Sequence, residues 1–191
     1  MKERFYDLVE QCPIIAAIKD DDGLQRCCEI EELKVVFVLY GDVCSIKKIV
    51  DTLHKANKIA MIHIDLITGL SSREVAVDFI HEYIRADGII STKVAMVQRA
   101  MEYSMYTVLR FFVIDSMSLN SINQLEKQYR KRPDMIEVLP GVMPKIIEKI
   151  CKNGKIPVIA GGLISDKEDV MKALGAGAIA VSTTAQEIWE M

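Results

Sequence analysis

The amino-acid sequence predicts an α/β protein with a compact (β/α)8 TIM-barrel fold. Eight apolar runs of strand length alternate along the chain with amphipathic segments of helical period. The runs are continuously apolar, as is typical of parallel strands that are covered on both faces. No linker or low-complexity tract divides the 191 residues, so residues 1–191 are predicted to form a single domain. An open doubly wound sheet is the alternative, but eight regular units favour a closed barrel.

Each predicted strand coincides with one apolar run. In chain order the strands are predicted at residues 12–18, 35–41, 59–66, 88–92, 106–115, 135–141, 156–162 and 178–184. Helices are predicted at residues 44–57, 73–84, 94–104, 121–131, 143–154 and 166–177, and Asp166 is a good N-cap for the last of these.

The chain is short for this fold, which typically needs about 250 residues. The shortening falls on the last helix, which is reduced to residues 185–191. A further helix is predicted at residues 2–11. It is expected to cover the barrel surface that a full final helix would otherwise protect.

Composition and charge exclude several classes of protein. The net charge of −3 argues against a dedicated nucleic-acid-binding module, although a local basic face is still compatible with it. Five cysteines without a C-x-x-C spacing make a disulfide framework or a zinc site improbable and fit a reducing cytoplasm. No apolar run approaches the roughly 20 residues needed to span a bilayer, and the N-terminus has no signal-like segment, so no membrane association is expected.

Glycines and hydroxyl residues end the last two predicted strands. Gly161 and Gly162 close the seventh strand, and Ser182 and Thr183 close the eighth. In barrels of this type these two loops often hold a phosphate. Glycine leaves the backbone N–H groups uncovered, the hydroxyls add donors, and a helix starting near Thr184 would add its own N–H groups. The pattern predicts a phosphate site, and the alternative is that the glycines only permit a tight turn.

Charged residues in or after the strands form a second group. Lys19 follows the first strand, Asp65 ends the third, Arg110 lies in the fifth and Glu137 in the sixth. Because a charge inside a barrel must be paired, Arg110 is expected to lie against Glu137, with His63 or Asp65 nearby. These side chains could make the polar contacts to a small phosphorylated ligand, or they could form a structural ion network.

An enzyme of the phosphosugar class, such as a lyase or isomerase, is the alternative function. Lys19 and Lys93 are candidate catalytic lysines, but neither has a catalytic signature in its spacing. No metal-ligand motif occurs and no cofactor is predicted. The protein is therefore expected not to be an enzyme.

Cations gather in the loops that lead from helix to strand. Arg130, Lys131 and Arg132 precede the sixth predicted strand, and Lys152 and Lys155 precede the seventh. In a barrel these loops share the N-terminal face and could contact the phosphates of a nucleic acid. The alternative is that cations near helix C-termini simply stabilise the helix dipole.

Several segments resemble the glycerol-3-phosphate-responsive antiterminator family. They are HIDLITGLSS at 63–72, ADGIISTK at 86–93, IEVLPGVMPKII at 136–147, IPVIAGGLI at 156–164 and AIAVSTT at 178–184. The resemblance implies a glycerol 3-phosphate sensor that binds an mRNA leader and regulates transcription antitermination in glycerol metabolism. The sequence leaves open whether the protein is a monomer or a homo-oligomer. It also implies that the phosphate site acts as the sensor, with Asp65 on the glycerol hydroxyls and Lys19 or Glu137 as a further contact to them.

Two segments depart from the family pattern. Lys19 is followed by the acidic run Asp20-Asp21-Asp22, which would repel an anion if it faced the site. The stretch YGDVC at 40–44 differs from the family's usual L-D-T-H-like stretch. A divergent homologue that keeps the ligand but has lost the RNA role is compatible with both departures.

Overall fold

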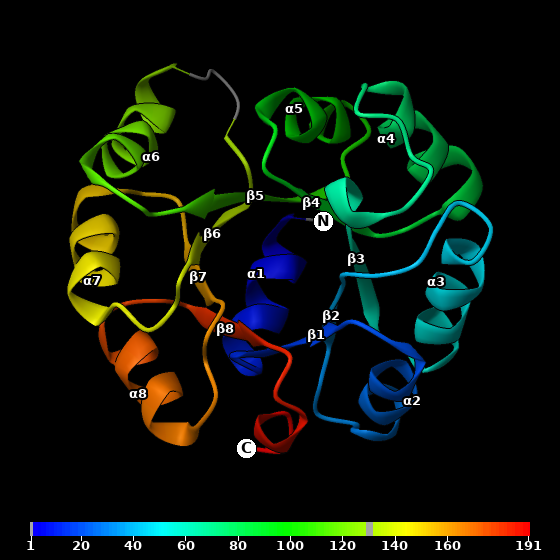
Figure 1. Ribbon diagram of the computed structural model, residues 1–191, viewed down its shortest axis with the longest axis horizontal. Coiled ribbons are helices and arrows are strands. Elements are labelled where there is room, and N and C mark those ends of the chain that lie inside the picture. Colours follow the sequence, from blue (N-terminus) through cyan, green and yellow to red (C-terminus); the bar gives the residue numbers. More distant parts are fainter. Residues whose placement is uncertain (1, 129–131) are drawn as a thin grey trace.

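The computed structural model describes residues 2–128 and 132–191 and contains a closed parallel barrel. The strands are ordered around the barrel as they are along the chain, with β8 pairing with β1 (Figure 1). Their bounds are β1 Ile14–Ile18, β2 Val35–Val38, β3 Ile59–His63, β4 Gly88–Ser91, β5 Tyr106–Phe112, β6 Met135–Leu139, β7 Val158–Gly161 and β8 Ala180–Thr183. The predicted fold class and all eight strands are confirmed.

Helices surround the barrel in an outer ring (Figure 1). They are α2 Asp21–Glu29, α3 Ile46–Lys55, α4 Val75–Phe79, α5 Val94–Glu102, α6 Ser116–Gln128, α7 Pro144–Asn153 and α8 Lys167–Gly175. A π-helical turn, η2 Ile80–Ile84, extends α4, and 3-10 turns form η1 Ile64–Leu66 and η3 Gln186–Ile188. The predicted cap of α8 is present, because the Asp166 carboxylate accepts a hydrogen bond of 2.8 Å from the Asp169 amide. None of the helices in the described part of the chain is long and apolar enough to cross a membrane.

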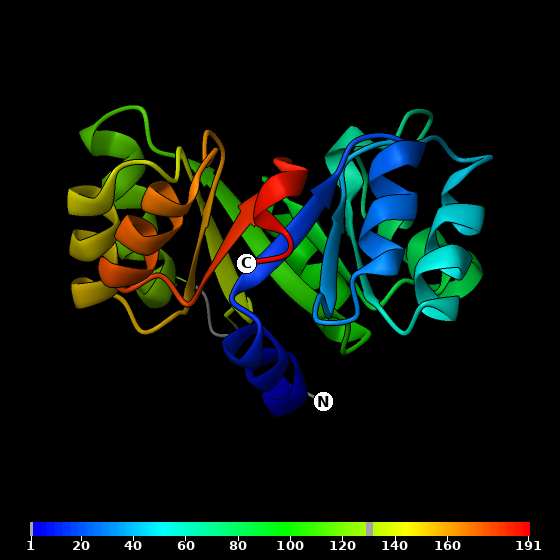
Figure 2. The ribbon, with the colours of Figure 1, turned by 90° about the horizontal axis from the view of Figure 1, so that it is seen from below.

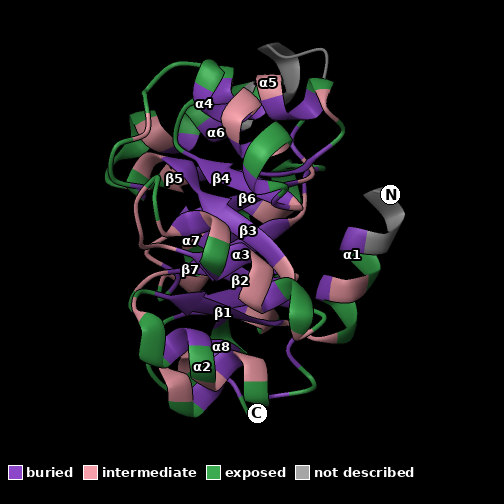
Figure 3. Cartoon of the chain, turned by 90° about the vertical axis from the view of Figure 1, so that its right-hand side faces the viewer, coloured by how far each residue is buried: buried purple, intermediate pink, exposed green. Residues whose placement is uncertain are grey.

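Two apolar clusters follow from the alternation of side chains along each strand. One fills the barrel and includes Ile15, Phe37, Met61 and Ile159. The other lies between the barrel and the outer helices, so that both faces of the sheet are covered. Figure 3 accordingly shows buried strands at the centre and exposure on the outer helices. This double coverage explains why the strand sequences are apolar without alternation.

The N-terminal helix α1, Lys2–Gln11, closes the lower end of the barrel (Figure 2). Phe5 and Val9 are fully buried in the cluster that fills the barrel, and the Phe5 ring stacks on Tyr106 with 4.5 Å between centroids. The expectation that this helix replaces the missing final helix on the outside is therefore wrong. Its apolar side chains Phe5 and Val9 are inserted into the barrel opening, where their burial stabilises the helix.

The place of a full final helix stays open. After β8 the chain forms only η3, and a groove of about 570 Å³ remains beside the start of β1. Its apolar lining comes from Val170 and Leu174 of α8 and from Pro13 and Ile14.

Candidate functional site

A cavity of about 670 Å³ opens at the C-terminal ends of the strands. Its lining comes from the ends of β1, β2, β6, β7 and β8, together with Arg110 from β5. Most of the residues that the sequence predicts to contact a phosphorylated ligand line this cavity. Those that line the cavity are Lys19, Arg110, Glu137, Gly162, Ser182 and Thr183.

Glu137 is the centre of the polar group under the cavity. Arg110 and Glu137 are neighbours in the register of β5 and β6, and Arg110 Nε donates to Glu137 Oε2 at 2.5 Å. The other carboxylate oxygen accepts a hydrogen bond from Ser182 Oγ. Glu137 is 1% exposed and Arg110 8% exposed, so the predicted pairing of these two charges is confirmed. The pair forms an internal ion network and also lines the cavity. A structural role and a contact to a ligand therefore do not exclude each other.

The two adjacent glycines have different roles. A Cβ atom at Gly161 would lie 2.5 Å from Glu137 Oε1 and 2.6 Å from Ser182 Oγ, so this glycine makes room for the carboxylate network. Gly162 has φ of +76° and lines the cavity, and a Cβ atom there would lie 3.0 Å from Leu139 Cδ2. At Gly161 the groups that approach the backbone closely are the side chains of Glu137 and Ser182, where the sequence predicted a phosphate.

The hydroxyls of β8 donate into the protein. Ser182 Oγ donates to Glu137, and Thr183 Oγ1 donates to the Ile164 carbonyl at 2.7 Å. Thr183 Oγ1 also accepts from the Ala185 amide at 3.1 Å. The two hydroxyls must therefore turn away from their present acceptors before they can donate to a phosphate.

The helix expected from Thr184 is a single 3-10 turn, η3. Three residues carry too small a dipole to attract an anion, so this part of the prediction is wrong. The Trp189 side chain holds the turn in place by donating from Nε1 to the Thr183 carbonyl at 2.9 Å. The cavity lining instead contains two cations, Lys19 and Arg110, and the backbone of residues 162–165.

Asp65 lies after β3 and does not line the cavity. Its Oδ2 atom accepts from Ser91 Oγ at 2.9 Å and from the Thr92 amide at 2.8 Å, and Lys93 Nζ lies 3.2 Å from Oδ1. Burial raises the pKa of Asp65, but these hydrogen bonds and the Lys93 charge outweigh burial and bring the pKa below its ordinary value. In this structure Asp65 fixes the loop after β4.

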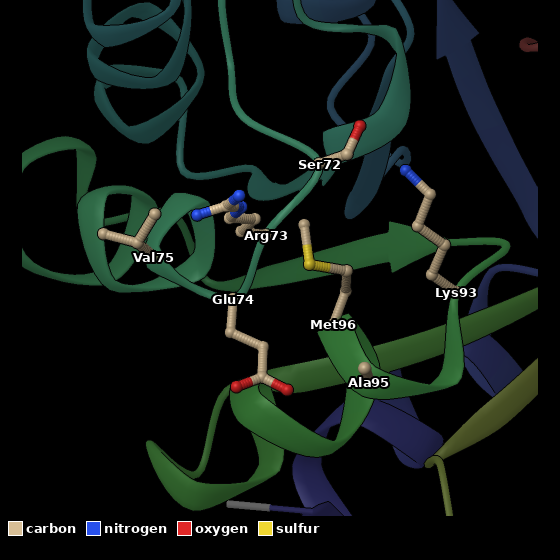
Figure 4. Close-up of a pocket in the computed structure, with 7 residues that line it drawn as sticks. All are labelled: Ser72, Arg73, Glu74, Val75, Lys93, Ala95 and Met96. Atoms are coloured by element: carbon tan, nitrogen blue, oxygen red, sulfur yellow. The ribbon is translucent and has the colours of Figure 1, made fainter.

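A second hollow of about 550 Å³ lies between the loop before α4 and the start of α5 (Figure 4). Arg73 and Lys93 bring two cations to it, and Ser72 and Glu74 also line it. Figure 4 shows the Lys93 side chain reaching away from Glu74, which agrees with its ion pair to Asp65.

The acidic run after Lys19 forms the start of α2. Asp20 caps the helix by accepting from the Gly23 amide at 2.8 Å, and Asp21 accepts from the Tyr40 hydroxyl at 2.7 Å. None of the three aspartates lines the cavity. The run therefore does not face the cavity, and the condition under which it would repel an anion there is not met.

The predicted basic face is only partly described. Arg130 and Lys131 lie outside the described residues. Arg132 and Lys155 are exposed, and Lys152 is exposed and pairs with Glu148 at 2.5 Å. Lys58, a further cation before β3, is 4% exposed and donates to the Leu33 carbonyl at 2.8 Å, so it contributes to folding and not to the surface.

Sequence inspection missed the apolar part of the lining. Leu39, Leu139 and Leu163 line the cavity beside its charges. The signal was available for the first two, since they stand two residues beyond Phe37 and Glu137 and so share their inward side. Leu163 has φ of +63° and is 74% exposed, and no sequence pattern predicts that conformation for leucine.

Two sequence comparisons match the chain over most of its length. The profile of the glycerol-3-phosphate responsive antiterminator family matches residues 14–189. The uncharacterized protein YgcP of Escherichia coli (strain K12) is 41% identical over 184 residues, which are 96% of this chain and 95% of YgcP.

Two solved structures are also similar. The glycerol uptake operon antiterminator regulatory protein of Listeria monocytogenes str. 4b F2365 is 34% identical, with a TM-score of 0.87 over 94% of this chain and 95% of its own. A glycerol uptake operon antiterminator-related protein of Thermotoga maritima MSB8 is 33% identical, with a TM-score of 0.78 over 93% of this chain and 98% of its own. The chain therefore belongs to the glycerol-3-phosphate responsive antiterminator family.

Proposed function

We propose that the protein is a sensor that binds glycerol 3-phosphate in the cavity at the C-terminal end of the barrel. In response to this ligand it binds an mRNA leader in the cytoplasm and acts as a transcription antiterminator. The observation that carries the ligand site is the convergence of Lys19, Arg110 and the Gly162–Ser165 turn on one cavity. Two cations beside a backbone turn suit a dianionic phosphate, although the Ser165 amide already donates to the Asp169 carboxylate. The antiterminator role is supported by the family to which the chain belongs.

Arg110 is prepared for this role by Glu137. The carboxylate holds Nε and thereby fixes the plane of the guanidinium group. A fixed guanidinium can bind a phosphate with less loss of side-chain entropy than a free one. Lys19, just after the C-terminal end of β1, supplies a second, exposed cation to the same cavity.

Lys19 offers the clearest test of the ligand site, because it is exposed and its removal should leave the fold intact. Calorimetry should show that Lys19→Ala lowers the affinity for glycerol 3-phosphate about tenfold, the loss expected for one charge-assisted contact. Lys48→Ala, which removes an exposed lysine from α3, is the matched control and should bind as the wild type does. Equal affinity in the wild type and both variants would contradict the placement of the phosphate.

A valine at Gly162 would fill the space of the predicted phosphate, but the Gly162→Val variant cannot test ligand binding. Its φ of +76° and the contact to Leu139 would strain the backbone whether or not a ligand binds there.

The RNA face is proposed to be the loops at the N-terminal end of the barrel. RNA affinity should fall steeply as salt is raised, because phosphate contacts release counterions. Replacing Arg130, Lys131 and Arg132 by alanine should abolish RNA binding and leave ligand binding unchanged. A control with the same change in charge replaces three exposed lysines elsewhere, namely Lys145, Lys149 and Lys167. Equal loss of RNA affinity in both triple variants would show that net charge alone matters.

The enzyme alternative has less support. A nucleophilic or basic lysine needs an environment that removes water from it. Lys19 is exposed, and Lys93 is exposed and paired with Asp65. Incubation with triose and pentose phosphates should give no turnover, and turnover lost in Lys19→Ala would establish an enzyme instead.

A further inference from the structure

The proposed function leaves open how the N-terminal face of the barrel contacts the bases of an RNA. Cations bind the phosphates of any sequence alike, so they position a nucleic acid without distinguishing its bases. The bases of a single-stranded RNA are bound by stacking on aromatic side chains and by hydrogen bonds along their edges. A base site on this face therefore requires an accessible aromatic ring beside uncovered polar groups, close to the cations.

A hollow of about 240 Å³ on the N-terminal face meets this requirement. It is lined by the loop between α7 and β7, by the loop between α8 and β8, and by Tyr6 of α1. Gly154 and Gly177 also line it, and neither has a side chain that would cover the backbone N–H and C=O groups. Lys155, an exposed residue, adds a cation to the lining. The hollow is smaller than the roughly 300–1,000 Å³ of pockets for drug-sized ligands, and its size suits a single flat heterocycle.

Tyr6 is the aromatic side chain in this lining. It follows Phe5, whose fully buried ring stacks on Tyr106 inside the barrel, so the packing of α1 holds Tyr6 in place (Figure 2). Tyr6 itself is 40% exposed. Burial of Phe5 therefore anchors the helix, and the Tyr6 ring is left accessible to a ligand. A ring held in this way loses little entropy when a base stacks on it.

The hollow lies beside the loop whose cations are proposed to bind RNA phosphates. The Ile136 amide of β6 donates to the Pro157 carbonyl at 3.0 Å, so the loops that precede β6 and β7 are neighbours. Pro157 lines the hollow, and Arg132 belongs to the loop before β6. A single strand whose phosphates contact that loop can therefore place a base in the hollow.

We propose that this hollow binds one unstacked base of a single-stranded RNA, with the base lying on the Tyr6 ring. The inference rests on the proposed function, because it requires RNA to bind the N-terminal face. Stacking tolerates any base, since every base has a π-face, and the uncovered backbone groups contact the edge of the base.

The test uses a fluorescein-labelled RNA of uridines, about ten nucleotides long, and an abasic strand with the same sugar-phosphate backbone. Fluorescence anisotropy at low salt, with glycerol 3-phosphate present, should show that the wild type binds the uridine RNA more tightly than the abasic strand. Tyr6→Leu removes the aromatic ring and should weaken binding of the uridine RNA about tenfold while leaving the abasic strand unchanged.

Two further variants are matched controls. Tyr6→Phe keeps the ring and should bind both strands as the wild type does. Tyr83→Leu removes a 66% exposed tyrosine from η2, which does not line the hollow, and should change neither affinity.

A measurement on the wild type alone does not depend on the folding of a variant. Irradiation of an RNA that carries 5-bromouridine crosslinks the base to an aromatic side chain on which it stacks. Mass spectrometry should locate the crosslink at Tyr6. Crosslinks found only at other residues would overturn the proposal.

The outcomes separate the two proposals. If the wild type binds neither strand, the proposed RNA function is wrong and this inference is wrong with it. If the wild type binds both strands equally, RNA binding stands and the base site is refuted. A preference for the uridine RNA that Tyr6→Leu keeps, or an equal loss of both strands in Tyr6→Leu, also refutes only the role of Tyr6.

Discussion

Gly161→Ala should expose how tightly the network under the cavity is packed. Gly161 does not have the left-handed backbone that favours glycine, so alanine is acceptable to the chain itself. The added methyl group would, however, lie 2.5 Å from Glu137 Oε1 and 2.6 Å from Ser182 Oγ. Both side chains are buried and hydrogen-bonded to each other, so they cannot simply turn toward solvent.

The cost has two parts. Inserting a methyl group into a packed interior costs about 1–3 kcal/mol. Separating Ser182 from the charged Glu137 removes a hydrogen bond that contributes roughly 1.5–3 kcal/mol. Because the network can relax in part, the free energy of unfolding is expected to fall by about 2–4 kcal/mol, in the range seen for disrupted buried networks.

Urea unfolding followed by circular dichroism measures this loss. Gly175→Ala is the matched control, since Gly175 ends α8 and a Cβ atom there meets nothing within 4 Å. Alanine at that position should leave stability unchanged or raise it by up to about 1 kcal/mol. The reasoning is refuted if Gly161→Ala is as stable as the wild type, or if both alanine variants lose the same amount.

Three other perturbations follow from the same structure. Glu137→Leu leaves the Arg110 charge buried without a partner and should lower the free energy of unfolding by about 3–5 kcal/mol in a urea titration. Phe5→Ala empties the lower opening of the barrel and should cost about 3–5 kcal/mol, against under about 1 kcal/mol for the 40% exposed Tyr6→Ala, as thermal unfolding would show. The pKa of His63 is about 4 in the folded protein against 6.5 ordinarily, so the unfolded chain binds this proton first as pH falls. The contribution of His63 to the free energy of unfolding, up to about 3 kcal/mol, should be present above pH 6.5 and be lost as the pH drops toward 4. Unfolding curves measured at both ends of this range should show the change in the wild type, and His63→Gln should lack it.

The sequence by itself determined the barrel. Continuous apolar runs, spaced by amphipathic segments, can bury both faces of each strand only in a parallel sheet covered by helices. The pairing of Arg110 with Glu137 also followed from the sequence, because two opposite charges in neighbouring inward positions must neutralise each other. The same holds for the Asp166 cap, which depends on residues only three positions apart.

The tertiary structure decided what lies against what. The position of α1 depended on whether Phe5 and Val9 meet the lower opening or the outer surface, and an amphipathic pattern alone fits both. The reason why residue 161 must be glycine is the Glu137 carboxylate packed against it, which comes from a different strand. The sequence indicates neither the neighbours nor the protonation of His63, because a lone histidine in a strand carries no information about either. Contacts between residues far apart in the chain fix those properties, and the spacing of residues along the sequence does not encode such contacts directly.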